Sequence, residues 1–171
     1  MKVLERNGLF LLLGLFSLLC AISCSLFVPT LTPAEQKSKT YSVKFTSTDW
    51  EKIPPNSSDL ALKNKKSSSV IFLNTTCQKY NDADLSHLSD NILSGIEKLQ
   101  ILKKEEVSFS GRKGVKVTAS GIMDGLPIFL DFLSVRKSMC LYDFVLISGK
   151  KEVRDNDIND FHQFLDGVTI E

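Results

Sequence analysis

The sequence has 171 residues and a mass of 19.1 kDa, and its first 23 residues have the pattern of a segment that is removed. About 148 residues remain, enough for one compact domain and too few for two. A hydrophobic content of 43% and a charged content of 24% exclude wholesale disorder, collagen-like structure and coiled coils, and four cysteines are too few for a disulfide scaffold. Loss of Lys2, Glu5 and Arg6 with the leader reduces 21 basic and 20 acidic residues to 19 of each. A neutral chain lacks the charge expected of a protein that binds nucleic acid.

The N-terminus, residues 1–23, is expected to be a secretory signal peptide. Lys2 and Arg6 lie before an apolar run of 14 residues, 9–22, which is shorter than the roughly 20 residues that a transmembrane helix needs. If the run is extended to Val28 it becomes long enough to cross a bilayer. An uncleaved membrane anchor is therefore the alternative.

Residues 21–24, Ala-Ile-Ser-Cys, resemble the lipobox of bacterial lipoproteins. The resemblance implies that Cys24 receives a diacylglyceryl group, that cleavage follows Ser23, and that the new amino group is acylated, for example with palmitate. Cys20 does not fit, because a leucine would occupy the −1 position. The alternative interpretation is that Cys24 is one more small residue in a membrane run. In the lipoproteins that the motif resembles, Asp after the cysteine favours the inner membrane, so Ser25 points to the outer membrane, facing the periplasm.

Residues 24–40 are expected to form the lipidated N-terminus and a flexible tether. The segment contains Pro29 and Pro33 and has no hydrophobic periodicity. Sixteen flexible residues have a root-mean-square reach of about 22 Å. The domain, residues 41–171, would therefore work close to a membrane surface.

The first part of the domain is predicted to form strands. Tyr41, Val43 and Phe45 alternate with polar residues, which is typical of a half-buried strand. Residues 46–55 are expected to be a loop that contains Trp50, the only tryptophan. Residues 60–62 and 70–73 are expected to pair as a loose hairpin.

A helix is expected next, capped by Asp82 or Asp84 and continuing through Gly95. Its apolar residues recur at spacings of three and four: Leu85, Leu88, Ile92, Ile96 and Leu99.

Four strands, 107–110, 115–123, 126–135 and 139–148, are expected to follow as a meander. Their turns are expected at 111–114, at Asp124-Gly125, which is a strong hairpin signal, and at 136–138 as a three-residue turn. A second helix is then expected from an Asp155 cap through Val168, with Gly167 ending it at a left-handed position.

The strands 126–135 and 139–148 are apolar on both faces, as in central strands that are covered on both sides. The element order predicts an α+β fold with an antiparallel sheet of about six strands flanked by helices. This order, Trp50 just after the first strand and the long hairpins are similar to the PsbP/Mog1-like family, an α/β/α sandwich, over most of residues 41–168. The resemblance implies a binding or assembly module, although fold alone does not determine function.

Cys77 and Cys140 are the cysteines left in the domain once Cys24 is acylated. In an exported protein such a pair predicts one disulfide, which would close a 64-residue loop. Two free buried thiols are the alternative.

Hairpin register predicts one internal polar group. With Asp124-Gly125 as the turn, Asp131 lies opposite Thr118 and diagonal to Lys116, and with a three-residue turn at 136–138 it also faces Asp143. Opposed carboxylates are unfavourable, so either Lys116 compensates them or one holds a proton. The functional interpretation is the polar floor of a small-ligand pocket. The alternative is a satisfied polar group near the strand ends, or a turn one residue shorter that moves Asp143 to the other face.

No pattern of a catalytic nucleophile, metal site or cofactor site is found. His87 and His162 have no cysteine or histidine at ligand spacing and are expected to be solvated helix residues. The acidic runs at 82–86 and 155–159 lie at expected helix starts and lack the Gly and Glu of a calcium loop.

The sequence therefore predicts a membrane-anchored cell-envelope lipoprotein that is not an enzyme and that needs no cofactor. Its domain is expected to bind or help assemble an envelope protein partner. The alternative is a small-ligand carrier or sensor that uses a cavity between helix and sheet.

Overall fold

The computed structural model describes residues 36–79, 83–149 and 153–171. The predicted leader, the tether up to residue 35 and Asp82 lie outside these residues. In chain order the elements are β1 (Tyr41–Val43), β2 (Trp50–Lys52), β3 (Leu60–Asn64), β4 (Val70–Cys77), α2 (Leu85–Ile92), β5 (Glu97–Phe109), β6 (Arg112–Met123), β7 (Leu126–Lys137), β8 (Cys140–Ser148), α3 (Asp155–Asp166) and β9 (Val168–Ile170).

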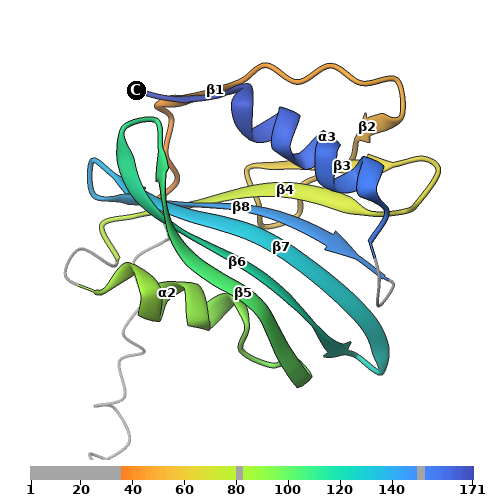
Figure 1. The fold of residues 1–171 in the computed structure, drawn as a ribbon. Helices are drawn as coiled ribbons and strands as arrows, with labels where there is room; N and C mark the ends of the chain where they lie inside the picture. Colours follow the sequence, from red (N-terminus) through yellow and green to blue (C-terminus); the bar gives the residue numbers. More distant parts are fainter. Residues whose placement is uncertain (1–35, 80–82, 150–152) are drawn as a thin grey trace, which may run out of the picture. The chain divides into compact units, whose positions relative to one another are not determined.

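Seven strands form one antiparallel sheet in the order β2-β3-β4-β8-β7-β6-β5 (Figure 1). β1 and β9 form a separate two-stranded antiparallel sheet. The described chain is thus an α+β fold, as predicted. β7 and β8 are central and almost continuously buried, which confirms the interpretation of their apolar runs.

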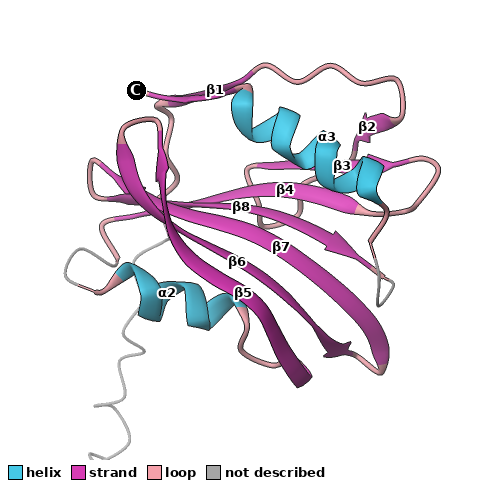
Figure 2. Ribbon diagram, in the orientation of Figure 1, coloured by secondary structure: helices cyan, strands magenta, loops and turns pink. Residues whose placement is uncertain are grey.

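The two helices cover opposite faces of the large sheet (Figure 2). On the α3 face, Phe161 and Phe164 pack with Leu73 and Phe144 of the sheet. On the α2 face, Leu93 packs in a second cluster with side chains that alternate with the first set, among them Val117, Phe132 and Val145. Each face therefore has its own hydrophobic core, and the central strands contribute to both.

The large sheet has seven strands, where about six were predicted. Residues 50–52 form β2 instead of a loop, and the predicted first strand, β1, pairs with β9 outside this sheet. Trp50 is buried in the α3-face core, and its indole nitrogen donates a hydrogen bond to Asp160 Oδ2 at 2.7 Å. This tertiary contact places the segment beside β3, where Trp50 pairs with Asn64. Nothing in the local sequence signals that pairing.

The predicted first helix is too long. Asp84, one of the two predicted caps, is the N-cap of α2 and accepts hydrogen bonds from the backbone N–H groups of Ser86 and His87, but the helix ends at Ile92. Gly95 has φ +87°, a left-handed conformation that interrupts a helix. Ile96 still packs against the α2-face core, so the apolar spacing continues although the helix does not, and Leu99 lies in β5.

Each hairpin of the meander turns through two residues that both have positive φ: Ser110-Gly111, Asp124-Gly125 and Ser138-Met139. The Asp124-Gly125 prediction is confirmed. The three-residue turn predicted at 136–138 is wrong, because Lys137 pairs with Cys140 at the end of β7. The observed turn shifts the register of β8 by three positions, so that Leu146 instead of Asp143 lies opposite Asp131. A shift by an odd number of positions moves the side chains of β8 to the opposite face from the predicted one.

The ends of α3 also differ from the prediction. Arg154 is its N-cap and Asp155 its first residue, and Val168 begins β9. Gly167 ends the helix with φ −82°, not in a left-handed conformation. A Cβ at this position would clash with the carbonyl oxygen of Lys44. Glycine is therefore needed here so that the chain after β1 can approach the helix end closely.

Candidate functional site

Residues 36–40, predicted to belong to the tether, are bound to the sheet. Cys77 N–H donates to the carbonyl oxygen of Gln36 at 2.8 Å, and Ser38 N–H donates to Thr75 Oγ1 at 2.8 Å. Ser38 Oγ also lies 2.7 Å from the hydroxyl oxygen of Tyr142. We call residues 36–40 the strap. Any flexible tether therefore ends before residue 36.

Cys77 and Cys140 form a disulfide that links β4 to β8 beside the strap. The two residues are direct partners in the antiparallel register. The disulfide and the bridge from Gln36 to Cys77 thus meet where the chain enters the sheet. The disulfide therefore links β4 and β8 covalently at the point where the strap joins the sheet.

The first part of the predicted polar group is present on the α3 face. Thr118 is paired with Asp131 and its hydroxyl donates to Asp131 Oδ1 at 3.3 Å, while Lys116 Nζ lies 3.5 Å from Asp131 Oδ2. Lys116 Nζ also lies 2.9 Å from His162 Nε2 of α3. Burial raises the pKa of Asp131, an effect that Lys116, His162 and Thr118 oppose. The carboxylate is thus buried and already surrounded by its own partners.

His162 is exposed, as expected, yet its contact with Lys116 was not predicted. The contact depends on how α3 lies across the sheet, and helix periodicity does not determine that placement.

Asp143 is not part of this group, because the two-residue turn pairs it with Ser134 while Asp131 pairs with Leu146. It lies on the α2 face, where it accepts a hydrogen bond from Ser134 Oγ at 2.6 Å. Burial raises the pKa of Asp143 to about 6, against the lowering effects of Ser134 and Lys37. The predicted opposition of two carboxylates is therefore wrong, and the alternative that moved Asp143 to the other face is correct.

Asp143 borders a pocket of about 320 Å³ between the sheet and the end of α2. The lining combines apolar and polar side chains, from Ser57, Ser58, Phe72, Asn74, Ile92, Asp143 and Val145. Its volume lies at the lower end of the range of small-molecule sites.

A larger groove of about 460 Å³ lies between β1 and the β2–β3 hairpin. Tyr41, Val43 and Leu62 contribute to its apolar lining, with Lys39 and Lys52 among its polar residues. Burial, together with the nearby Asp59, raises the pKa of the Tyr41 hydroxyl.

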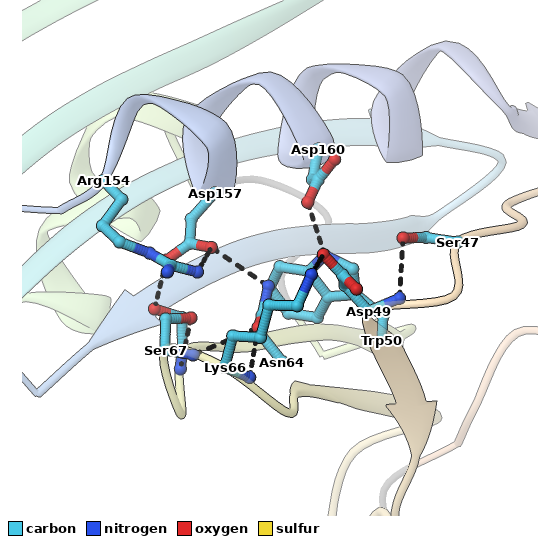
Figure 3. A network of polar contacts seen from close by, with 10 residues as sticks. Ser47, Asp49, Trp50, Asn64, Lys66, Ser67, Arg154, Asp157 and Asp160 are labelled. Carbon is cyan, nitrogen blue, oxygen red and sulfur yellow. Dashed lines mark hydrogen bonds and ion pairs between the residues drawn. The ribbon is translucent and has the colours of Figure 1, made fainter.

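A third polar network fastens α3 to the β3–β4 hairpin (Figure 3). The fully buried carboxylate of Asp157 accepts hydrogen bonds from Asn64 Nδ2 at 3.1 Å and Ser69 Oγ at 2.8 Å, and Arg154 Nη2 lies 3.3 Å away. These donors engage Asp157, the central carboxylate of the acidic run 155–159. Across the described ranges, no group of three His, Cys, Asp or Glu residues is arranged to hold a metal ion.

Large apolar side chains are exposed at one end of the sheet, on β5 and the β6–β7 hairpin. We call this surface the apolar corner, and its residues and exposed fractions are Leu99 (37%), Ile101 (49%), Leu102 (59%), Met123 (37%) and Leu126 (65%). Ile101 is paired with Ala119 of the α2-face core, and Met123 with Leu126. The corner therefore continues the apolar α2 face beyond the core that α2 covers.

The adjoining edge of β5 is protected against pairing with another strand. The strand has register shifts near Lys98 and Leu102, and Lys103, Lys104 and Glu105 follow along the edge. Bulges and charges of this kind oppose edge-to-edge association. Any contact at the corner would therefore be made by its side chains and not by the strand edge.

Within the part of the chain that the structure describes, no helix has the length and apolar character needed to cross a membrane. No family model matches the sequence, and no curated protein matches it.

Solved structures with a similar fold include that of LpqN, described as involved in cell envelope biogenesis of Mycobacterium tuberculosis. It matches with a TM-score of 0.55 and 11% identity over 81% of this chain and 87% of that chain. A structure from Bacteroides thetaiotaomicron matches with a TM-score of 0.54 and 8% identity over 77% of this chain and 45% of that chain. The solution structure of PsbP from the cyanobacterium Synechocystis matches with a TM-score of 0.49 and 7% identity over 77% and 93% of the two chains. The likeness to the first two shows a shared α+β fold.

Proposed function

We propose that this protein is a membrane-anchored cell-envelope lipoprotein whose domain binds or helps assemble another envelope protein, without catalysis. The apolar corner is the observation that carries the binding role. Soluble domains seldom expose several large apolar side chains together unless that surface is a contact site. The partner is expected to present an apolar surface of its own.

Two of the buried carboxylates, those of Asp131 and Asp157, support a non-catalytic role. The carboxylate of Asp131 is buried against Thr118 and Lys116, and that of Asp157 is fully engaged with the β3–β4 hairpin and Arg154. A general acid or base must reach the proton that it transfers. Neither carboxylate is presented to a substrate in this way.

The anchor is supported by the lipobox-like residues 21–24. Two or more acyl chains hold a protein stably at a bilayer, because each buried methylene contributes about 0.8 kcal/mol and a single chain is marginal. Similarity to LpqN, a protein involved in cell envelope biogenesis, agrees with an envelope location. Ser25 favours the outer membrane, with the domain in the periplasm.

Palmitate labelling tests the anchor. The wild-type protein should incorporate labelled palmitate and fractionate with membranes, and Cys24→Ala should lose the label. Cys20→Ala is the matched control and should keep it. Label retained by Cys24→Ala would reject Cys24 as the modified residue.

Site-specific photo-crosslinking tests the binding surface. A photoreactive residue at Leu126 should give a discrete crosslinked protein in cells, and Ile101→Glu should remove that product because it places a charge in the corner. The same photoreactive residue at Thr169, an exposed position on β9, is the matched control and should give no such product. Equal crosslinking from both positions, or none from Leu126 in folded protein, would contradict the proposed surface.

A further inference from the structure

The pocket beside α2 is lined by the mostly buried side chain of Asp143, and one of its two carboxylate oxygens has no hydrogen-bond donor among the described residues. Asp143 Oδ1 accepts the hydrogen bond from Ser134, and no described residue donates to Oδ2. Every fully buried side-chain nitrogen or oxygen in the described ranges has a hydrogen-bond partner. Oδ2 must therefore border the open volume, and the only pocket that Asp143 lines among those described is the one of about 320 Å³.

The charge of this carboxylate is only partly neutralised by its surroundings. The positive charge of Lys37, in the strap, acts on Asp143 and favours its ionised form. However, Lys37 Nζ donates to Asn74 Oδ1 at 2.5 Å and lies 3.9 Å from Asp59 Oδ2. Arg136, on the same face of β7, donates to the carbonyl oxygen of Ala83 at the start of α2. The pKa of Asp143 is raised despite Lys37, which shows that burial outweighs the stabilisation of its charge.

The remaining walls determine what else a ligand must carry. Phe72, Ile92 and Val145 give the pocket an apolar side, and α2 contributes no charge to it because Ile92 is its lining residue. Asn74, Ser57 and Ser58 supply further hydrogen-bonding groups at the polar side. A ligand therefore meets the carboxylate of Asp143, neutral polar groups and an apolar wall, while the ammonium of Lys37 is held by Asn74 Oδ1 and lies 3.9 Å from Asp59 Oδ2.

We propose that this pocket binds a small organic cation, in which a primary ammonium donates to Asp143 Oδ2 and a compact apolar group packs against Phe72, Ile92 and Val145. An anion would be repelled by the carboxylate, and a metal ion would find a single acidic ligand. The site lies on β4, β8 and the end of α2, so the proposal does not depend on the apolar corner or on a protein partner. It assigns a ligand class to the alternative carrier or sensor role.

Nuclear magnetic resonance titration of the full-length protein in a nonionic detergent tests the proposal, with 2-phenylethylammonium as the probe. At pH 7.5 the probe should shift the amide signals of Asn74, Asp143 and Val145 in a saturable way. At pH 5 binding should weaken by about tenfold, because only about one in ten Asp143 carboxylates would be ionised at a pKa of about 6. 2-Phenylethanol, which has the same ring and no charge, should bind more weakly and without this pH dependence.

Two variants separate this site from other acidic surfaces. Asp143→Asn keeps the size of the side chain and should abolish binding of the probe. Asp131→Asn, which changes a buried carboxylate on the opposite face, is the matched control and should bind as wild type does. The pH titration of the wild-type protein gives an answer even if one variant fails to fold.

Three outcomes would overturn the proposal. The first is equal affinity for the ammonium and the alcohol, the second is binding that does not change between pH 7.5 and pH 5, and the third is the absence of saturable shifts around Asp143 in folded protein. None of these outcomes affects the palmitate or crosslinking results, so failure here is distinguishable from failure of the proposed function.

Discussion

Replacing Asp143 by asparagine should change how the stability of this protein depends on pH. Burial raises the pKa of Asp143 from its usual 3.8 to about 6 in the folded protein. Between these values the folded state holds more protons at this position than the unfolded state does. The wild-type protein should therefore lose stability from this group as pH rises from about 4 to about 6, and no further loss should follow above that window.

The size of the effect follows from the shift of the pKa. A difference of about two units corresponds to about 3 kcal/mol, at 1.36 kcal/mol for each unit. The substituted asparagine would carry no titrating proton and can still accept the hydrogen bond from Ser134. Asp143→Asn should therefore gain about 3 kcal/mol relative to wild type between pH 4 and pH 7.

Urea denaturation of both proteins at a series of pH values provides the measurement, with the disulfide intact. The difference between their free energies of unfolding removes the contributions of all other titrating groups. The difference at pH 4 reports the cost of the substitution itself, because Asp143 is protonated there in the folded state. A difference that stays constant from pH 4 to pH 8 would refute the reasoning, as would a directly measured carboxyl pKa below about 4.5.

Three further predictions concern the framework of the domain. Gly167→Ala should destabilise the fold by about 1–3 kcal/mol in urea melts, because its methyl group clashes with a neighbouring backbone carbonyl; Gly149→Ala, with no heavy atom near its added Cβ, should change little. Replacing Cys77 and Cys140 together by alanine should lower the unfolding free energy by about 4 kcal/mol, the loop-closure value for residues 63 apart, and an unchanged midpoint would contradict that role. Asp157→Ala should cost about 3 kcal/mol, because it leaves buried donors of the β3–β4 hairpin unpaired; a loss well below 1 kcal/mol would show that the network is not a fastener.

Short-range sequence signals predicted much of the meander correctly. Asp124-Gly125 determines its own turn, because both residues tolerate positive φ, and the turn then sets the pairing of Thr118 with Asp131. The doubly apolar runs of β7 and β8 likewise identified central strands. In both cases the cause lies within a few residues of the effect.

The turn at Ser138-Met139 shows where such reasoning fails. Neither residue favours positive φ, and the turn residues alone suggest a longer loop. The observed turn is held by the long ladder between β7 and β8 and by the register of β4 with β8, in which Cys77 lies opposite Cys140. The resulting register differs from the predicted one by three positions, which moved Asp143 to the other face and divided the predicted polar group in two.

By itself, the sequence determined the fold class, the central strands and the pairing of Asp131 with Thr118, and it narrowed the cap of α2 to Asp82 or Asp84. Each of these features depends on local conformational preference or on the burial of a periodic apolar face. The tertiary structure decided which strand lies beside Trp50, that His162 meets Lys116, and that Asp143 lines a pocket. Those features depend on how distant segments pack, and the free energy that selects the packing is spread over contacts that no short stretch of chain contains.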